Sequence, residues 1–227
     1  MTAIHHMSAT ALSEAIASGS ISCVETMQAF LTQIEATNPA VNALINLDPP
    51  EHCLALAVKA DEALRAGQRK GWLHGMPIAI KDLAHAADFQ TTFGSRIFES
   101  FIATEDDPHV ARIRAAGAII IGKTNVPEWG LGGHTQNSLH GLTRNALDHR
   151  LTAGGSSGGA ATALASHMLP LADGSDMMGS LRTPAAFQSI VGFRPTPGRV
   201  PAPFELDPFE LKLVSLGPMG RNVADTS

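Results

Sequence analysis

Two serines flanked by glycine pairs form the strongest chemical signal in this 227-residue sequence. The segment Gly154–Gly159 reads GGSSGG and precedes an Ala-rich stretch, residues 160–166, that is typical of a helix. Glycines permit backbone conformations closed to other residues and let a ligand approach the main chain. The segment is therefore compatible with a phosphate-binding loop, with a nucleophile elbow, or with a catalytic relay to groups elsewhere in the chain.

The first two interpretations each lack a required feature. A phosphate-binding loop uses a lysine of the Walker type and an acidic partner, and neither follows the segment. The G-x-S-x-G pattern of an elbow fits around Ser156, but it needs a strand directly before it, and residues 145–153 are polar. A Ser-His-Asp triad with His167 and Asp173 fails on the same strand context. A relay through Ser156 needs none of these features.

A further serine, Ser180, follows Gly179 where another short helix is expected to begin. Free backbone N–H groups at the start of a helix can stabilise a developing oxyanion, so a serine placed there is a candidate nucleophile. The alternative is that Ser180 is only the N-cap of that helix.

Lysine is scarce, with five in the chain, and Lys81 directly follows the apolar run Pro77–Ile80. A lysine at the end of a buried strand loses hydration of its ammonium form, which lowers its pKa and makes it a usable general base. An ion pair with the neighbouring Asp82 is the alternative role.

Three segments carry a family resemblance. They read GMPIAIKD (residues 75–82), GGSSGG (154–159) and GSLRTPAAF (179–187). Ser156 follows Lys81 by 75 residues, and Ser180 follows Ser156 by 24. Two flanking segments, residues 122–128 and 191–200, fit the same pattern. From about residue 8 onward the chain resembles the amidase signature family.

The resemblance implies a Ser-Ser-Lys triad. In such a triad Ser180 attacks an amide carbonyl, Ser156 relays the proton, and a neutral, buried Lys81 accepts it and later returns it to the leaving amine. Family members hold the serine at position 156 after a cis peptide bond, so we expect Gly155–Ser156 to be cis.

The resemblance also implies an oxyanion hole built from backbone N–H groups. The expected donors are Met177, Met178, Gly179 and Ser180. Met178 departs from the family pattern, which usually has the first of two glycines there. Because only the main chain donates, we expect this side chain to narrow or line the acyl pocket rather than to abolish the hole.

The elements that position these groups alternate between helix and strand, which predicts an α/β fold. The resemblance sharpens this to the amidase-signature fold, with a mixed, partly parallel central sheet flanked by helices. Residues 1–70 are expected to form an N-terminal helical layer, and residues 71–227 the catalytic core. Strands are expected at residues 76–80, 118–121, 168–172 and 190–193, with a turn at residues 122–125 after the second of them. Helices are expected from Ser8, Ser22, Pro50, His109, Pro127, Ala160 and Ser180, and the helix from Ser22 is expected to stop near Asn38-Pro39.

Composition excludes several classes of function. The net charge of −5 and the lack of a basic run argue against a nucleic-acid partner. No apolar stretch approaches the roughly 20 residues of a membrane span. The N-terminus lacks a signal-peptide pattern, and Cys23 and Cys53 form no disulfide framework. We predict a cytoplasmic protein with reduced thiols, no cofactor, no metal, and a solvated His5-His6 pair.

The family's complete domain is considerably longer than this chain. We therefore expect residues 1–227 to represent one truncated amidase-signature domain, incomplete at the C-terminal side, with an exposed sheet edge and apolar patch. The expected partners are a small amide substrate and either a missing C-terminal half or a second copy of the chain.

The predicted function is hydrolysis of the carbon–nitrogen bond of small carboxamides through an acyl-enzyme. Two alternatives remain open at this point. One is a protein that releases ammonia from glutamine, like the A subunit of a glutamine amidotransferase. The other is an inactive truncated paralogue.

Overall fold

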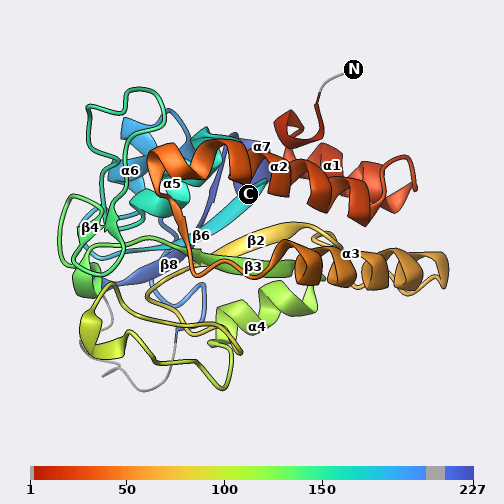
Figure 1. Cartoon of the computed structure of the whole chain (residues 1–227), viewed down its shortest axis with the longest axis horizontal. Coiled ribbons are helices and arrows are strands. Elements are labelled where there is room, and N and C mark those ends of the chain that lie inside the picture. Colours follow the sequence, from red (N-terminus) through yellow and green to blue (C-terminus); the bar gives the residue numbers. More distant parts are fainter. Residues whose placement is uncertain (1–2, 203–212) are drawn as a thin grey trace.

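Helices cover both faces of the central strands in the computed structural model, which describes residues 3–202 and 213–227. Figure 1 shows α1, α2 and α5 on one face and α4 on the other. The helices are α1 (Ala9–Ala17), α2 (Cys23–Val41), α3 (Pro50–Arg65), α4 (Pro108–Ala115), α5 (Gly158–Ala165), α6 (Arg182–Phe187) and α7 (Val223–Thr226), with 3-10 turns at Ile4–His6, Arg96–Phe98 and Glu128–Gly130. The strands are β1 (Leu44–Ile45), β2 (Pro77–Lys81), β3 (Ile119–Thr124), β4 (Gln136–Asn137), β5 (Gly141–Leu142), β6 (Leu171–Asp176), β7 (Val191–Gly192) and β8 (Ser215–Gly220).

Two three-stranded sheets form the centre of the described structure. One has the order β1-β3-β2, with β2 and β3 parallel and β1 antiparallel to β3. The other has the order β6-β8-β7 and is antiparallel. Strands β2 and β6 lie beside each other, so the sheets meet there. The prediction of an α/β fold with a mixed sheet is confirmed.

The N-terminal helices follow the expected cap signals. Ser8 caps α1, and Ser22 forms a capping box with Glu25 at the start of α2. Pro50 stands at the first position of α3, as expected. Asp61, which interrupts the apolar side of α3, accepts the N–H groups of Cys23 and Val24 at 2.7 and 3.1 Å. Its carboxylate therefore caps α2 from the neighbouring helix.

Helix α2 continues beyond its predicted end. The sequence predicted a stop near Asn38-Pro39, whereas the helix includes Pro39 and ends at Val41. Asn42, in the left-handed region at φ 51°, terminates it. The Asn38 side chain accepts the N–H groups of the two residues after that turn, Ala43 and Leu44, which stabilises the exit.

Strand β3 also runs further than predicted. Residues 122–125 were expected to form a turn, but β3 includes them up to Thr124. The register with β2 shifts at this point: Ile120 lies opposite Ile78, and Gly122 lies opposite Ala79, so one residue of β3 is extra. Gly122 therefore belongs to a β-bulge rather than to a turn.

Three other predicted boundaries are wrong. The strand expected at 168–172 is β6, which begins at Leu171 and continues through polar residues to Asp176. Pro127 precedes only a 3-10 turn, not an α-helix. Helix α6 starts at Arg182 instead of Ser180.

The largest buried apolar side chains join the helical layer to the strands. Phe30 and Met27 of α2 are fully buried, as are Ile80 of β2 and Ile121 of β3. Leu164 extends this core into α5, which fixes the glycine-rich segment just before it. Among the described helices, none has the combined length and apolarity to cross a bilayer.

Candidate active site

Lys81 ends β2 and is fully buried among hydroxyl groups. Its Nζ lies 2.8 Å from the Oγ atoms of both Ser156 and Ser157, and 2.9 Å from Ser175 Oγ. Ser175 O is 3.4 Å away. None of these partners is a carboxylate, so among the described residues an ammonium at Nζ has no counter-ion in hydrogen-bonding contact.

This environment favours the neutral amine. Burial lowers the pKa of Lys81 to about 7, against the opposing influence of Asp173 and Asp176. Asp82 does not pair with Lys81. Its carboxylate lies 3.6 Å from Lys123 Nζ and accepts the N–H of Thr92 at 3.1 Å. The ion-pair alternative for Lys81 is therefore wrong.

The glycine-rich segment turns its amides toward the protein. The N–H groups of Ser157, Gly158 and Gly159 each donate to a protein oxygen at 3.2 Å, namely Ser180 O, Thr135 Oγ1 and Asn125 O. A Cβ on Gly159 would lie 2.3 Å from Asn125 N, so the start of α5 packs directly against the backbone that follows β3. These three N–H groups are therefore not available to a phosphate. The Gly155–Ser156 peptide bond is cis, as expected.

Ser180 lies against this segment, since its carbonyl oxygen accepts the Ser157 N–H. It is half-buried, and its Oγ makes no hydrogen bond to any described residue. Leu181 is the N-cap of α6, without a side-chain cap bond, so Ser180 is not the cap of that helix. Its hydroxyl is thus free to face a ligand.

Three of the four expected oxyanion donors are free within the described residues. These are the N–H groups of Met177, Met178 and Ser180. The fourth, Gly179 N–H, donates to Asp176 Oδ1 at 2.7 Å. The Met178 side chain is 90% exposed, so it is available to a substrate instead of being part of the core.

Asp176 fixes this turn. Arg182 Nε donates to one carboxylate oxygen at 2.9 Å, and Arg194 Nη1 donates to the other at 2.8 Å. Although burial favours the neutral carboxyl, the bonds from Arg182 and Gly179 hold the pKa of Asp176 well below its usual range. The charged Asp176 therefore orients the backbone on which Ser180 stands.

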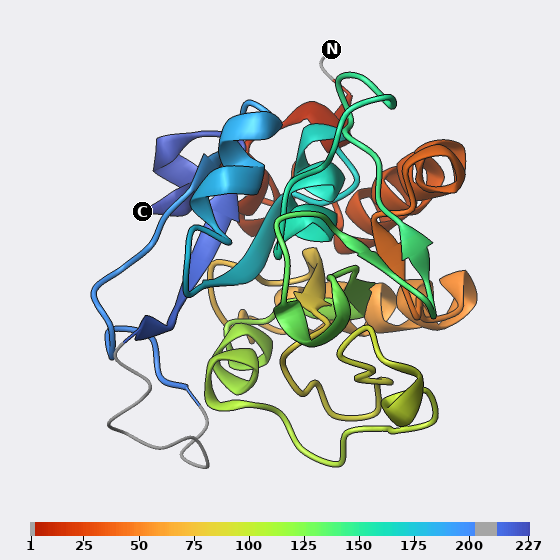
Figure 2. The ribbon, with the colours of Figure 1, turned by 90° about the vertical axis from the view of Figure 1, so that its left-hand side faces the viewer.

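An aromatic cluster stands beside Ser156. Trp129 stacks on Phe93 with ring centroids 5.6 Å apart, and Phe98 meets both edge-on. A Cβ on the adjacent Gly130 would lie 3.6 Å from Ser156 Oγ, which places this loop next to the relay serine. The long segment between β2 and α4, which carries Phe93 and Phe98, loops out at the bottom of Figure 2.

Sequence reasoning missed Ser175 as a member of this neighbourhood, and it considered Asp173 only as part of a Ser-His-Asp triad with His167. Asp173 and Ser175 alternate along β6, which places both on one strand face, and this periodicity was the available signal. Their strand was predicted to end at residue 172, so the pattern was not used.

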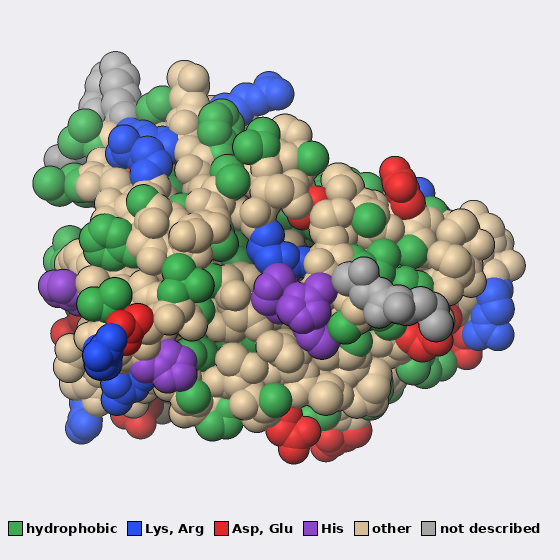
Figure 3. Space-filling model, turned by 90° about the horizontal axis from the view of Figure 1, so that it is seen from above, with side chains coloured by type: hydrophobic (Ala, Val, Ile, Leu, Met, Phe, Trp, Pro, Cys, Tyr) green, Lys and Arg blue, Asp and Glu red, His purple; other side chains and the backbone are tan. Residues whose placement is uncertain are grey.

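The histidine candidates, His5, His6 and His167, contact one another. His167 contacts His6, with ring centroids 4.2 Å apart, and His6 contacts His5 at 4.5 Å. Histidine side chains gather on the face shown in Figure 3. Burial and the nearby Arg221 lower the pKa of His167 to about 4. The cysteines are free and buried, as predicted.

Comparison with known proteins agrees with this geometry. A sequence model of the amidase family matches residues 25–227. The chain belongs to that family.

Specific relatives extend the comparison. The chain is 41% identical over 225 residues to the A subunit of glutamyl-tRNA(Gln) amidotransferase from Chloroflexus aurantiacus, covering 99% of this chain and 46% of the relative. Its fold matches a bacterial aryl acylamidase of the amidase signature family with a TM-score of 0.91 at 30% identity, covering 99% and 47% of the two chains. It also matches the peptide amidase of Stenotrophomonas maltophilia with a TM-score of 0.88 at 32% identity, covering 97% and 46%. The chain spans about half the length of these relatives.

Proposed function

We propose that this chain carries a Ser-Ser-Lys centre for hydrolysis of the carbon–nitrogen bond of small carboxamides, with Ser180 as nucleophile, Ser156 as relay and Lys81 as base. The observation that carries the proposal is the buried Lys81 amine, 2.8 Å from Ser156 Oγ, with a pKa lowered to about 7. An amine of this kind is neutral for a substantial part of the time at physiological pH.

The reaction divides into two acyl-transfer steps. Ser180 Oγ attacks the amide carbonyl carbon while its proton passes through Ser156 to Lys81 Nζ. The charge that develops on the carbonyl oxygen is stabilised by the free N–H groups of Met177, Met178 and Ser180. Lys81 then returns the proton to the leaving amine. In the second step water attacks the acyl-enzyme, its proton passes to the same relay, and the relay returns a proton to Ser180 Oγ as the acid leaves.

A fluorophosphonate probe tests the nucleophile without requiring a known substrate. We expect the wild-type chain to be labelled at Ser180 and the folded Ser180→Ala variant to remain unlabelled. Ser100→Ala, which changes an exposed serine, should label like the wild type. Equal labelling of Ser180→Ala, or peptide mapping that locates the adduct on another residue, would refute the assignment.

A second candidate function is release of ammonia from glutamine for use by a partner protein. It is favoured by the 41% identity to the A subunit of an amidotransferase. Glutamine hydrolysis by the chain together with its partner, and transfer of the ammonia to a charged acceptor, would distinguish it from hydrolysis of free amides. The same centre would serve both reactions. Probe labelling of Ser180 would also exclude an inactive remnant.

A further inference from the structure

Asp173 connects the two sheets at the point where Lys81 ends β2. Its Oδ1 accepts the main-chain N–H of Lys81 at 2.8 Å, and both residues are buried. Strands β2 and β6 lie side by side but are not paired in a ladder. The carboxylate therefore makes the hydrogen bond that a neighbouring strand would otherwise provide to this amide.

The same face of β6 also contacts the side-chain amine of Lys81. Asp173 and Ser175 are two residues apart, so their side chains point to the same side of the strand. Asp173 binds the main chain of Lys81, and Ser175 Oγ lies 2.9 Å from its Nζ. One strand thus fixes both the backbone and the amine of this residue.

We propose that Asp173 is a positioning residue for Lys81: its carboxylate fixes the end of β2 and keeps a negative charge beside the amine that takes up the proton. The inference rests on the proposed role of Lys81 as the base.

The neighbouring charges explain why Asp173 is distinctive. Two other carboxylates stand near Lys81, and both have cationic partners. Asp82 is accompanied by Lys123, and Asp176 is bonded to two arginines. Among the described residues, the Asp173 carboxylate forms no ion pair with a lysine or arginine side chain. Charged or titratable groups face Lys81 and Asp173 from all the elements packed around them. The acidic groups are Asp82, Asp173 and Asp176, and the basic groups are Lys123, His109, Arg112, Arg182, Arg194 and Arg199.

His109 of α4 holds the second oxygen of Asp173, with Nε2 3.4 Å from Oδ2. Its Nδ1 is buried without a partner among the described residues. A buried unpaired N–H is costly, and Nε2 is the ring nitrogen that faces an acceptor, so we assign the donor role to Nε2–H, which donates to Asp173 Oδ2. This hydrogen bond orients the carboxylate.

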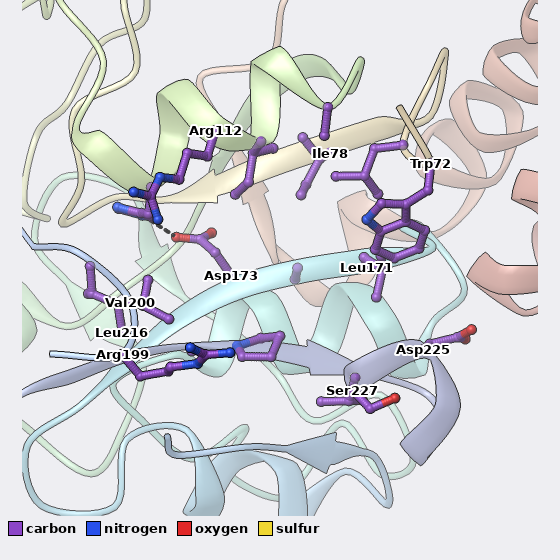
Figure 4. A pocket seen from close by; sticks show the side chains of 18 of the residues that line it. Trp72, Ile78, Arg112, Leu171, Asp173, Arg199, Val200, Leu216, Asp225 and Ser227 are labelled. Atoms are coloured by element: carbon purple, nitrogen blue, oxygen red, sulfur yellow. Dashed lines mark hydrogen bonds and ion pairs between the residues drawn. The ribbon is translucent and has the colours of Figure 1, made fainter. Parts of the chain in front are cut away.

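A groove gives solvent access to this pair. Asp173 and His109 lie in the wall of a cavity of about 380 Å³ whose lining also includes Trp72, Arg112 and Arg199. Figure 4 shows Asp173 pointing from β6 toward α4, with the Arg112 side chain nearby and Trp72 at the far end of the groove. Neither Ser156 nor Ser180 lines this cavity. Asp173 therefore lies between the proposed catalytic centre and a separate opening.

The charge of Asp173 has a defined effect on proton uptake. Burial lowers the pKa of Lys81, and the Asp173 carboxylate raises it, with a net value of about 7. Removing the charge while keeping the hydrogen-bond acceptor should lower the pKa further. Lys81 would then remain neutral at a more acidic pH, and the acidic limb of any amide-hydrolysis profile would move down with it.

Lysine-selective NMR tests the inference directly. The chain has five lysines, so ¹³C-lysine labelling gives few signals, and a Lys81→Met variant assigns the relevant one. In wild-type protein we expect a titration midpoint of about 7. Asp173→Asn should lower it by roughly one pH unit, the size expected when a nearby opposite charge is lost. Asp88→Asn, the same change at an exposed site, should leave the midpoint unchanged.

The outcomes separate the inference from the proposed function. An unchanged Lys81 midpoint in folded Asp173→Asn, with the wild-type midpoint at about 7, would overturn the inference and leave the triad intact. A wild-type Lys81 midpoint near the ordinary lysine value of about 10 would remove the base itself and overturn both. If Asp173→Asn does not fold, Asp173→Ser removes the same charge, retains a hydroxyl acceptor and must give the same downward shift.

Discussion

Two buried lysines lie in the last two residues of neighbouring parallel strands, and their surroundings differ in kind. Within residues 3–202 and 213–227, Lys81 on β2 has only hydroxyl and carbonyl hydrogen-bond partners at its Nζ, from Ser156, Ser157 and Ser175. Lys123 on β3 donates to Ala84 O at 2.6 Å and to Thr91 Oγ1 at 2.9 Å, and it also has a carboxylate, Asp82, at 3.6 Å. Both amines are buried, so burial alone does not distinguish them.

The difference indicates that the set of partners, rather than burial, distinguishes the proposed base Lys81 from a buried lysine that has a counter-ion. Burial lowers the pKa of both lysines, but Lys123 has Asp82 as a counter-ion, which favours its charged form. Lys81 has hydroxyls that can accept from an ammonium or donate to a neutral amine. The three hydroxyls around Lys81 suit both protonation states, which a proton-transfer residue must occupy in turn, whereas Asp82 favours the charged form of Lys123.

The largest expected effect is on activity, at Lys81. Lys81→Met should reduce kcat/KM for an amide substrate by about 10⁴-fold, because it removes the proposed base. Its free energy of unfolding, measured in urea, should change little, since an apolar side chain replaces an amine without a counter-ion. Retention of wild-type kcat/KM would refute the distinction between the two lysines.

The second effect is on stability, at Lys123. Lys123→Met leaves Asp82 buried without its cation, and should lower the free energy of unfolding by about 3–5 kcal/mol. Fluorophosphonate labelling of the fraction that remains folded should resemble the wild type. Adding Asp82→Asn should recover part of the lost stability. A Lys123→Met variant that is as stable as the wild type would show that the pair has no structural role.

The smallest effect lies in the helical layer, far from either lysine. Asp61→Ala removes the carboxylate that caps α2 and should cost about 1 kcal/mol in the free energy of unfolding. The labelling rate at Ser180 should stay at the wild-type value. Glu62→Ala, which changes the exposed neighbour, is the matched control. Equal stability of the two variants would contradict the capping role.

Much of this arrangement was predictable from local sequence signals. The starts of α1, α2 and α3 depend on capping residues and a proline that lie within one turn, so sequence alone identifies them. Lys81 could be singled out because lysine is scarce in this chain and because this lysine directly follows the apolar run Pro77–Ile80. The roles of Ser156 and Ser180 are implied by the resemblance to the amidase signature family, which motif order and spacing carry, and they remain predictions for the experiments above.

The parts that could not be predicted depend on contacts between distant segments. Nothing local indicates that Asp61 caps another helix, that Asp173 reaches the main chain of Lys81, or that Gly179 gives its N–H to Asp176. Strand β6 was misplaced because Asp, Gly and Ser have low strand propensity, and tertiary contacts overrode that preference.

The bulge in β3 determines how the side chains of Lys81 and Lys123 are placed relative to each other. With uninterrupted pairing, Lys123 would lie directly opposite Lys81, on the same face of the sheet. The extra residue moves it opposite Ile80 and leaves Thr124 beside Lys81. Because side-chain direction alternates along a strand, this single insertion sends the two amines to opposite sides. Deleting one residue at Ile121 would bring two buried amines together in one hydroxyl-lined site, where the two amines would compete for one proton.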